Sequence, residues 1–521
     1  MPQPWWRSAV FYQIYVRSFA DSNDDGIGDL PGITSRLGYV KDLGVDAIWL
    51  TPFYPSPQKD HGYDVADYFD VNPEYGTLED FDRLLARAHE LRLKVLVDIV
   101  PNHTSDQHEW FQAAISAPDS PFRERYHFAD GKGDGQPPNN WTSSFGGPAW
   151  SREPNGGQWY LHLFAPEQPD LNWWHPEVPK EFERILQFWL DRGADGFRID
   201  VASALFKRQD LADRPTIKDP VTGELKLDST FAIIDQPQLH EVYRRWRQIA
   251  NGFRPDRVLV GEIFEPRRHS KYIVPDQLHM AFALMNQPWE AQLWKRSIET
   301  MRRALHGPDS EPTWTLGNHD VTRPVTRFGG GSMGRARARA ALLLVLGLPG
   351  QVFLYQGEEL GLEEVNVPDS ERQDPVFFHS KGLHAGRDGC RVPLPWHRGQ
   401  PNAGFSKAKP WLPMPAGWDA LAVDVQSGSG ESMLAHFRRA LAIRRRISGR
   451  MSARVDGKAA PPGALVYERE QLTVACNFGA RSIKLRLPGH LVIASDPLAK
   501  LRHGTFSLPP NSAAWLTASS L

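Results

Sequence analysis

The sequence predicts an α/β protein: a parallel (β/α)8 (TIM) barrel with a small domain inserted after its third strand and a C-terminal antiparallel β-domain. Eight short runs of β-branched or apolar residues recur along the chain, and most are separated by segments with helical spacing of apolar residues. Strand–helix alternation repeated eight times is typical of this barrel. A doubly wound sheet is the alternative, but the first run is followed by VRSF rather than by the glycine-rich phosphate turn of that fold.

The predicted elements follow in chain order. The eight strands span residues 9–15, 47–52, 94–100, 196–201, 258–264, 278–284, 313–320 and 351–359. Residues 78–93 and 178–193 carry apolar side chains three and four positions apart, which predicts amphipathic helices. The run at 94–100 is almost continuously apolar, as expected for a strand that is buried on both faces.

Two long interruptions and a change of pattern divide the chain into domains. Residues 103–170 are rich in Pro, Gly and Trp without a sustained period, which predicts an inserted domain. A second excursion, 360–430, follows the eighth strand, and 431–448 is predicted as a closing amphipathic helix. Short strand-like runs beyond it predict a β-sandwich domain over 449–521. The barrel is therefore expected to comprise 1–102 and 171–448.

The composition excludes several classes of protein. Among 521 residues, 60 Lys plus Arg balance 62 Asp plus Glu, so the charge gives no sign of a nucleic-acid or anionic-membrane partner. Only Cys390 and Cys476 are present, which excludes a disulfide framework. The first residues lack a secretory pattern, and the apolar stretch at 341–355 is broken by Gly and Pro and is too short to cross a bilayer. We therefore expect a cytoplasmic protein.

Acidic residues end three of the predicted strands, at the end of a barrel where active sites form. They are Asp200, Glu262 and Asp320, accompanied by His103, Arg198 and His319. One such acid alone is usually a helix cap or an ion-pair partner, but three in one ring predict shared chemistry. Glycoside hydrolysis requires such a set, with an ionised carboxylate as nucleophile and a protonated one as acid, about 5 Å apart in retaining enzymes.

The local context assigns the two roles. Arg198 lies two residues before Asp200 and so points to the same side of the strand, where its charge is expected to lower the pKa of Asp200. Glu262 follows the apolar run 258–261, a setting in which a raised pKa suits a general acid. Asp200 and Glu262 are therefore predicted to face each other across one cleft.

The motifs around these residues resemble those of the α-amylase superfamily, glycoside hydrolase family 13, and most closely its α-glucosidase and oligo-1,6-glucosidase branch. They are DIVPNH (98–103), GFRIDV (196–201), VGEIF (260–264) and LGNHD (316–320), supported by DHGYDV (60–65) and RDGCRVPLPW (387–396). The resemblance implies Asp200 as nucleophile, Glu262 as general acid/base and Asp320 as the third acid, which grips substrate hydroxyls. The positions that it implies as contacts of the sugar or the nucleophile are His103, Arg198 and His319.

Other matched residues concern specificity. Asp60 and Arg391 match a pair that closes the pocket around the non-reducing glucose in exo-acting members, and Tyr63 matches the aromatic that stacks on the sugar ring. The alternative for Asp60 and Arg391 is an ion pair that only ties two loops together. Val201 resembles the α-1,6-acting members, and a β-branched side chain there shifts selectivity by about 1–3 kcal/mol. Ile263 departs from the branch, in which Thr or Met is common, so linkage preference is less determined than reaction type.

The loop DSNDDGIGD (21–29) has the spacing of a calcium-binding loop, with an oxygen donor at every second residue. The donors are the side chains of Asp21, Asn23, Asp25 and Asp29 and the carbonyl of Ile27. The family branch carries structural Ca²⁺ or Mg²⁺ at the matching loop, so the resemblance implies a structural ion here and no cofactor for catalysis. An acidic turn held by side-chain hydrogen bonds alone is the alternative.

Together these observations predict a retaining, exo-acting α-glucosidase that removes terminal α-1,4- and/or α-1,6-linked glucose through a covalent glucosyl–Asp200 intermediate. Transfer to an acceptor sugar is an expected side reaction. One alternative is a transglucosidase or isomerase (sucrose-, isomaltose- or trehalose-forming); a remote one is a non-catalytic relative that acts as a binding subunit. The expected partner is a small oligosaccharide or α-glucoside, with no nucleic acid or membrane, and the protein is expected to be a monomer or homodimer.

Overall fold

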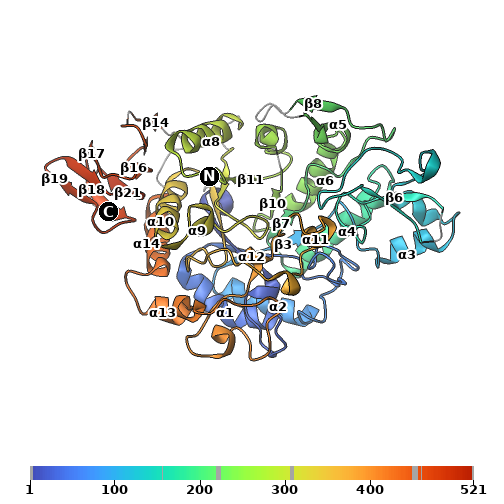
Figure 1. Ribbon diagram of the computed structural model, residues 1–521, viewed down its shortest axis with the longest axis horizontal. Coiled ribbons are helices and arrows are strands. Elements are labelled where there is room, and N and C mark those ends of the chain that lie inside the picture. Colours follow the sequence, from blue (N-terminus) through green and yellow to red (C-terminus); the bar gives the residue numbers. More distant parts are fainter. Residues whose placement is uncertain are drawn as a thin grey trace.

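A closed barrel of eight parallel strands forms the centre of the protein (Figure 1). The computed structural model describes residues 4–154, 157–218, 225–263, 265–305, 310–448, 456–458 and 460–518. The barrel strands are β1 (Val10–Ile14), β2 (Ala47–Leu50), β3 (Lys94–Ile99), β7 (Gly196–Ile199), β10 (Val258–Gly261), β11 (Met280–Leu284), β12 (Thr313–Thr315) and β13 (Gln351–Tyr355). Each coincides with a predicted strand, so the predicted (β/α)8 barrel is confirmed.

Seven of the eight barrel strands end earlier than predicted, and the catalytic candidates lie just beyond three of them. β7 ends at Ile199 rather than at 201, β10 at Gly261 rather than at 264, and β12 at Thr315 rather than at 320; Phe264 lies outside the described residues. At β7 the reason is conformational, because Val201 has φ +47°, outside the extended region. The acids therefore belong to the loops at the barrel mouth.

Helices surround the barrel as the sequence periodicity predicts. The longer ones that cover it are α1 (Leu30–Leu43), α2 (Leu78–Glu90), α4 (Glu177–Arg192), α6 (Leu239–Asn251), α8 (Ala291–Arg303), α10 (Gly331–Gly347) and α14 (Met433–Ser448). The helices predicted at 78–93, 178–193 and 431–448 are α2, α4 and α14. Short helices lie in the connections: α3 (Glu109–Ser116), α5 (Ser229–Ile233), α7 (His269–Tyr272), α9 (Pro324–Arg327), α11 (Pro375–His379), α12 (Asp388–Arg391) and α13 (Val423–Ser427).

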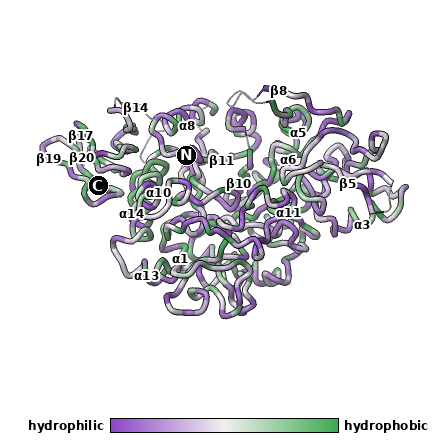
Figure 2. The backbone as a smooth tube through the Cα atoms, in the orientation of Figure 1, coloured by the Kyte–Doolittle hydropathy of each residue, from purple (hydrophilic) through white to green (hydrophobic). Residues whose placement is uncertain are grey.

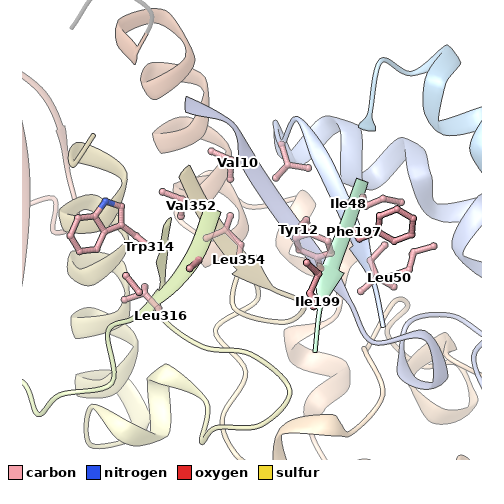
Figure 3. Packing of buried hydrophobic residues seen from close by; sticks show 14 of the residues in the cluster. Val10, Tyr12, Ile48, Leu50, Phe197, Ile199, Trp314, Leu316, Val352 and Leu354 are labelled. Carbon is pink, nitrogen blue, oxygen red and sulfur yellow. The ribbon is translucent and has the colours of Figure 1, made fainter. Parts of the chain in front are cut away.

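Alternation along the strands separates the core into two layers. Side chains that point outward pack against the helices in the main core, as Figure 3 shows for Tyr12, Phe197 and Ile199. The intervening residues, including Trp49 and Val260, form a second cluster inside the barrel. The same alternation turns Asp98, Arg198 and the acids that follow β7 and β10 inward at the C-terminal end. The site is thus an extension of the inner layer, in which charge replaces apolar side chains.

Two smaller units flank the barrel (Figure 1). Between β3 and β7 the chain forms α3 and an antiparallel sheet of order β4-β6-β5, made of β4 (Phe128–Ala129), β5 (Trp150–Arg152) and β6 (Trp159–Leu161). A hairpin of β8 (Thr216–Lys218) and β9 (Leu225–Leu227) follows β7. The C-terminal unit has two antiparallel sheets, of order β14-β15-β16-β21-β18 and β17-β20-β19.

The strands of the C-terminal unit are β14 (Asp456–Gly457), β15 (Ala464–Arg469), β16 (Leu472–Asn477), β17 (Ile483–Arg486), β18 (His490–Ala494), β19 (Lys500–Arg502), β20 (Thr505–Leu508) and β21 (Ser512–Thr517). Four short strand-like runs of the sequence coincide with β15 to β18, whereas β14 and β19 to β21 were not predicted. Trp515 of β21 donates its indole N–H to the Leu343 carbonyl of α10 at 2.9 Å, which ties this unit to the barrel. Residues 449–455, at the predicted domain boundary, lie outside the described part of the chain.

Hydrophilic and hydrophobic residues alternate along the tube around the barrel (Figure 2), as amphipathic helices require. In the part of the chain that the structure describes, none of the helices has the length and apolar character needed to span a bilayer.

Candidate active site

A cavity of about 570 Å³, including its open mouth, lies at the C-terminal end of the barrel. Its lining consists of Asp60, Tyr63, His103, Phe145, Phe164, Asp200, Val201, Glu262, His319, Asp320 and Arg387. Every residue predicted for catalysis or substrate binding is in this set except Arg198 and Arg391, which are buried. The predicted strand-end residues therefore converge on one pocket.

Arg198 joins the two central carboxylates. Its Nη1 lies 2.6 Å from Asp200 Oδ1, and its Nη2 lies 2.9 Å from Glu262 Oε1. Nη1 also donates to Asp98 Oδ1 at 3.0 Å. Because β7 and β10 are adjacent, with Ile199 opposite Gly261, the acids that follow them are neighbours. Bridging by the two ends of one planar guanidinium places Asp200 and Glu262 side by side, as a retaining mechanism requires.

Three carboxylates share this one guanidinium, and that ratio decides their protonation. Burial raises the pKa of Asp200 well above its ordinary value; Arg198 opposes the rise, and Glu262 and Asp98 add to it. Burial likewise raises the pKa of Asp98 to about 7, against the opposing charge of Arg198. Arg198 acts on the pKa of Asp200 in the predicted direction, but burial and the neighbouring carboxylates outweigh it, so the predicted net lowering is wrong. A cluster with more carboxylates than cations retains a proton near neutral pH, and a retaining glycosidase needs that proton on its acid.

Glu262 occupies a more polar setting than its apolar neighbours in sequence suggest. Besides its contact with Arg198, its Oε2 accepts the backbone N–H of Val201 at 3.2 Å. The Glu262 carbonyl accepts the N–H of Ala202 at 3.1 Å. The expectation of an apolar environment around this carboxylate is wrong, because the left-handed turn at Val201 directs successive N–H groups from the end of β7 to Glu262.

His319 and Asp320 form a neutral–charged pair at the end of β12. His319 Nδ1 lies 2.7 Å from Gln13 Nε2, an amide donor, so Nδ1 is the acceptor and Nε2, 3.4 Å from Asp320 Oδ2, carries the proton. Burial holds the pKa of His319 well below its ordinary value, so the ring is neutral at pH 7. Although burial favours the neutral acid, the charges of Arg387 and Arg391 lower the pKa of Asp320, which stays ionised.

Tyr63 and His103 complete the wall on the side of β2 and β3. The Tyr63 ring stacks on His319 with centroids 5.3 Å apart, and its hydroxyl donates to Asp98 Oδ2 at 3.0 Å. His103 Nε2 lies 3.1 Å from the Tyr63 carbonyl and 3.0 Å from Gln168 Nε2. Burial lowers the pKa of His103 to about 4, so this ring too is neutral at pH 7. The wall offers neutral hydrogen-bonding groups and an aromatic face, which suits a sugar.

The predicted pair of Asp60 and Arg391 is wrong, because Asp60 pairs with Arg387 instead. Arg387 Nη2 lies 2.7 Å from Asp60 Oδ1, and its Nη1 lies 3.1 Å from Asp320 Oδ1. Arg391 is fully buried and binds Asp320 Oδ1 at 3.0 Å and the His319 carbonyl at 2.9 Å. Arg387 is the residue that precedes α12 and Arg391 is the last residue of this short helix, so the two arginines are four positions apart across a single helical turn. Sequence spacing gave no basis for choosing between them.

Sequence reasoning also missed two aromatic residues of the pocket. Phe145 and Phe164 line it from the inserted region, and the Arg387 guanidinium lies over the Phe145 ring at 5.0 Å. Gln168, from the same region, donates to Asp60 Oδ2 at 3.1 Å. These residues come from a segment without periodicity, and its richness in aromatics was the one signal that could have suggested them.

In the loop 21–29, for which a structural ion was predicted, side-chain oxygens accept hydrogen bonds from other groups of the same loop. Asp21 Oδ1 accepts the N–H of Asn23 at 3.0 Å, its Oδ2 accepts that of Gly26 at 2.8 Å, and Asn23 Nδ2 donates to Asp25 Oδ2 at 3.0 Å. Asp29 binds the N–H of Gly32 and so caps α1. Within the described residues, no group of three or more His, Cys, Asp or Glu side chains is placed to hold a metal ion. The oxygen donors suit Ca²⁺ chemically, and no step of the chemistry below depends on an ion.

Comparison with known proteins agrees with this geometry. The family model "Alpha amylase, catalytic domain" matches residues 13–449, and the chain belongs to this family of glycoside hydrolases. The probable alpha-glucosidase of Rhizobium meliloti (strain 1021) is 41% identical, covering 85% of this chain and 82% of that protein. The oligo-1,6-glucosidase of Parageobacillus thermoglucosidasius is 34% identical, covering 96% and 94%. The crystal structure of the alpha-glucosyl transfer enzyme XgtA has a TM-score of 0.90 at 39% identity, covering 99% of this chain and 100% of that one. The resemblance inferred from the motifs is confirmed.

Proposed function

We propose that the protein is a retaining α-glucosidase that removes single glucose units from the non-reducing end of short oligosaccharides or α-glucosides. The observation that carries this proposal is the pairing of Asp200 and Glu262 through Arg198 at the base of a pocket with one closed wall. The glycosidase relatives support the substrate class.

In this mechanism the proton that the carboxylate cluster retains lies on Glu262, so that Asp200 is ionised and attacks the anomeric carbon from the β face, opposite the leaving oxygen. A C–O bond forms to its carboxylate as the bond to the leaving oxygen breaks, and Glu262 donates its proton to that oxygen. Glu262, now ionised, then takes a proton from water, whose oxygen attacks the same carbon and releases Asp200. Two inversions leave the product in the α configuration. Ionised Asp320, beside neutral His319, is placed to accept hydrogen bonds from the sugar hydroxyls.

The closed wall accounts for the exo mode of action in this proposal. Asp60 and Arg387 are both buried or nearly so and are joined at 2.7 Å, which blocks continuation of a chain beyond the reacting glucose. Phe145 and Phe164 lie on the pocket lining and offer apolar faces for the sugar or its leaving group. The substrate therefore enters with its non-reducing end first.

A glucosyl-transfer enzyme is the second candidate, because any hydroxyl that enters before water takes the same glucosyl unit from Asp200. The similarity to the transfer enzyme XgtA favours it. Incubation with maltose, isomaltose, sucrose and trehalose, with products resolved by size and anomer, separates the two. We expect α-glucose as first product, with cleavage of isomaltose within a hundredfold of that of maltose. Predominance of longer or rearranged sugars at low substrate concentration would support transfer or isomerisation instead, and β-glucose would exclude a retaining mechanism.

Two further expectations remain predictions. The protein is proposed to act as a monomer or homodimer on a small-molecule glucoside, which sedimentation analysis tests. Its cytoplasmic location is likewise a prediction, and cell fractionation tests it.

A further inference from the structure

The buried carboxylate of Asp374 holds Arg387 without reaching the pocket itself. Asp374 is completely buried and is not part of the cavity lining, whereas Arg387 is. Asp374 Oδ2 accepts Arg387 Nε at 2.8 Å, and its Oδ1 accepts Nη2 at 2.9 Å. The Arg387 backbone N–H also donates to Oδ2. One side chain thus fixes both the main chain and the guanidinium plane of the arginine.

This bidentate contact determines which nitrogens of Arg387 face the sugar. With Nε and one hydrogen of Nη2 used by Asp374, the remaining donors point to Asp60 at 2.7 Å and to Asp320 at 3.1 Å. A two-point contact between guanidinium and carboxylate fixes orientation as well as position. Asp374 remains ionised because, although burial opposes it, Arg387 holds the pKa of this carboxyl well below its usual range.

The surrounding backbone is shaped for this contact. Gly386, at φ +74°, precedes Arg387, and a Cβ added there would lie 2.9 Å from the Asp374 side chain. Asp388 Oδ2 accepts the backbone N–H of Asp374 at 3.1 Å, which holds the main chain from which the carboxylate extends. Asp374 and Arg387 therefore close the two ends of the segment 375–386, so that this loop begins and ends at the pocket wall.

We propose that Asp374 is a positioning residue that holds Arg387 against Asp60 and Asp320 and thereby sets the affinity of the pocket for the terminal glucose. The proposal deepens the proposed function and rests on it. Without the Asp374 charge, the carboxylates that remain paired with Arg387 are Asp60 and Asp320, which face the substrate, and the arginine draws them away from the sugar hydroxyls. Loss of Asp374 therefore weakens glucose binding while Asp200 and Glu262 stay in place.

The test uses D374N, which keeps the size of the side chain and an acceptor for the N–H of Val376 in α11, bound at 3.0 Å. We expect KM for maltose and the Kd of 1-deoxynojirimycin, measured by calorimetry, to rise about tenfold or more, with kcat within threefold. D374E, which restores the charge, recovers part of the loss. The matched control is D195N, a change at an equally buried, ion-paired carboxylate at the other end of the barrel, which lowers stability and leaves KM and Kd unchanged.

A crystal structure of D374N separates this inference from the proposed function. Displacement of Arg387 from Asp60 and Asp320 supports the positioning role even if wild type proves inactive on every glucoside, a result that would refute the proposed function alone. An unmoved Arg387 with unchanged Kd would overturn the inference. Equal rises in KM for D374N and D195N would also overturn it, because they would show a general loss of structure.

Discussion

The two ends of strand β7 carry buried aspartates in opposite electrostatic settings. Asp195 precedes the strand, and its Oδ1 binds Lys94 at 2.9 Å and Arg257 at 2.7 Å, while Oδ2 lies 2.7 Å from His89. Although burial favours its neutral form, His89 and Lys94 lower the pKa of Asp195. Asp200 follows the strand, shares Arg198 with other carboxylates, and has a raised pKa.

The difference shows that burial alone does not set the state of a carboxylate; the ratio of cations to carboxylates around it does. Three basic groups surround Asp195, whereas three carboxylates surround Arg198. The ion pairs at the N-terminal end of the barrel thus contribute to stability. At the C-terminal end several carboxylates compete for one arginine, so that a proton can move between them.

The largest expected effect comes from removing the reacting groups at the C-terminal end. D200N and E262Q are each expected to lower kcat by at least about a thousandfold, because one loses the nucleophile and the other the transferable proton. D200N should also raise the free energy of unfolding, since it relieves competition for Arg198. Initial rates with an α-glucoside and urea unfolding provide the measurements. A D200N enzyme with wild-type rates would refute the assignment of the nucleophile.

The next effect, at the N-terminal end, is on stability rather than activity. D195N is expected to lower the free energy of unfolding at pH 7 by roughly 2–3 kcal/mol, less than for a fully buried pair because Lys94 and His89 are partly exposed. Because the folded pKa of Asp195 is depressed, its contribution is present above the unfolded value of about 3.9 and is lost as pH falls through the folded value. The difference in the free energy of unfolding between D195N and wild type should become smaller below pH 4. A constant gap would show that the ion pairs do not cause it.

A third buried carboxylate, that of Glu358, extends the comparison because no donor among the described residues makes a hydrogen bond to it. Both oxygens of Glu358 are without a hydrogen-bond partner, and burial raises its pKa to about 8. The contribution of this carboxyl group to the free energy of unfolding is fully present below its pKa in the unfolded chain, about 4.3, and is lost as the pH rises toward 8. The free energy of unfolding of E358Q, relative to that of wild type, should therefore rise by roughly 1–3 kcal/mol between pH 5 and pH 9. Urea unfolding at both pH values measures this, and a pH-independent difference would contradict it.

The smallest expected effect concerns the acidic loop after β1. We retain the proposal of a structural Ca²⁺ or Mg²⁺ held by Asp21, Asn23, Asp25, Ile27 and Asp29. Excess chelator should then lower the melting temperature by about 1 °C, the shift expected in a chain of this length for loss of roughly 1 kcal/mol of ion-linked stability. D21N should remove this response. A melting temperature indifferent to chelator would leave the loop as a turn held by the hydrogen bonds among its own residues.

Much of the fold was predictable because its signals are local and repeated. The eight strand segments and the helices at 78–93 and 178–193 follow from apolar spacing, which depends only on burial of one or both faces. Strands β19 to β21 were missed because short strands near turns resemble irregular segments in composition. The strand ends at β7 and β10 were misplaced because apolar residues, Val201 and Ile263, continue past the point where the backbone leaves the sheet.

By itself the sequence determined the chemical inventory of the site: which acids, histidines and arginines stand where strands end, and therefore which reaction they can perform. Only the tertiary structure decided which arginine pairs with which carboxylate. Arg387 rather than Arg391 reaches Asp60, although the two flank the same helical turn at α12. Asp200 has a raised pKa despite the arginine two residues before it. Pairing and protonation depend on distances between segments far apart in the chain, and on how many charges share each counter-ion. No local pattern of residues encodes either quantity.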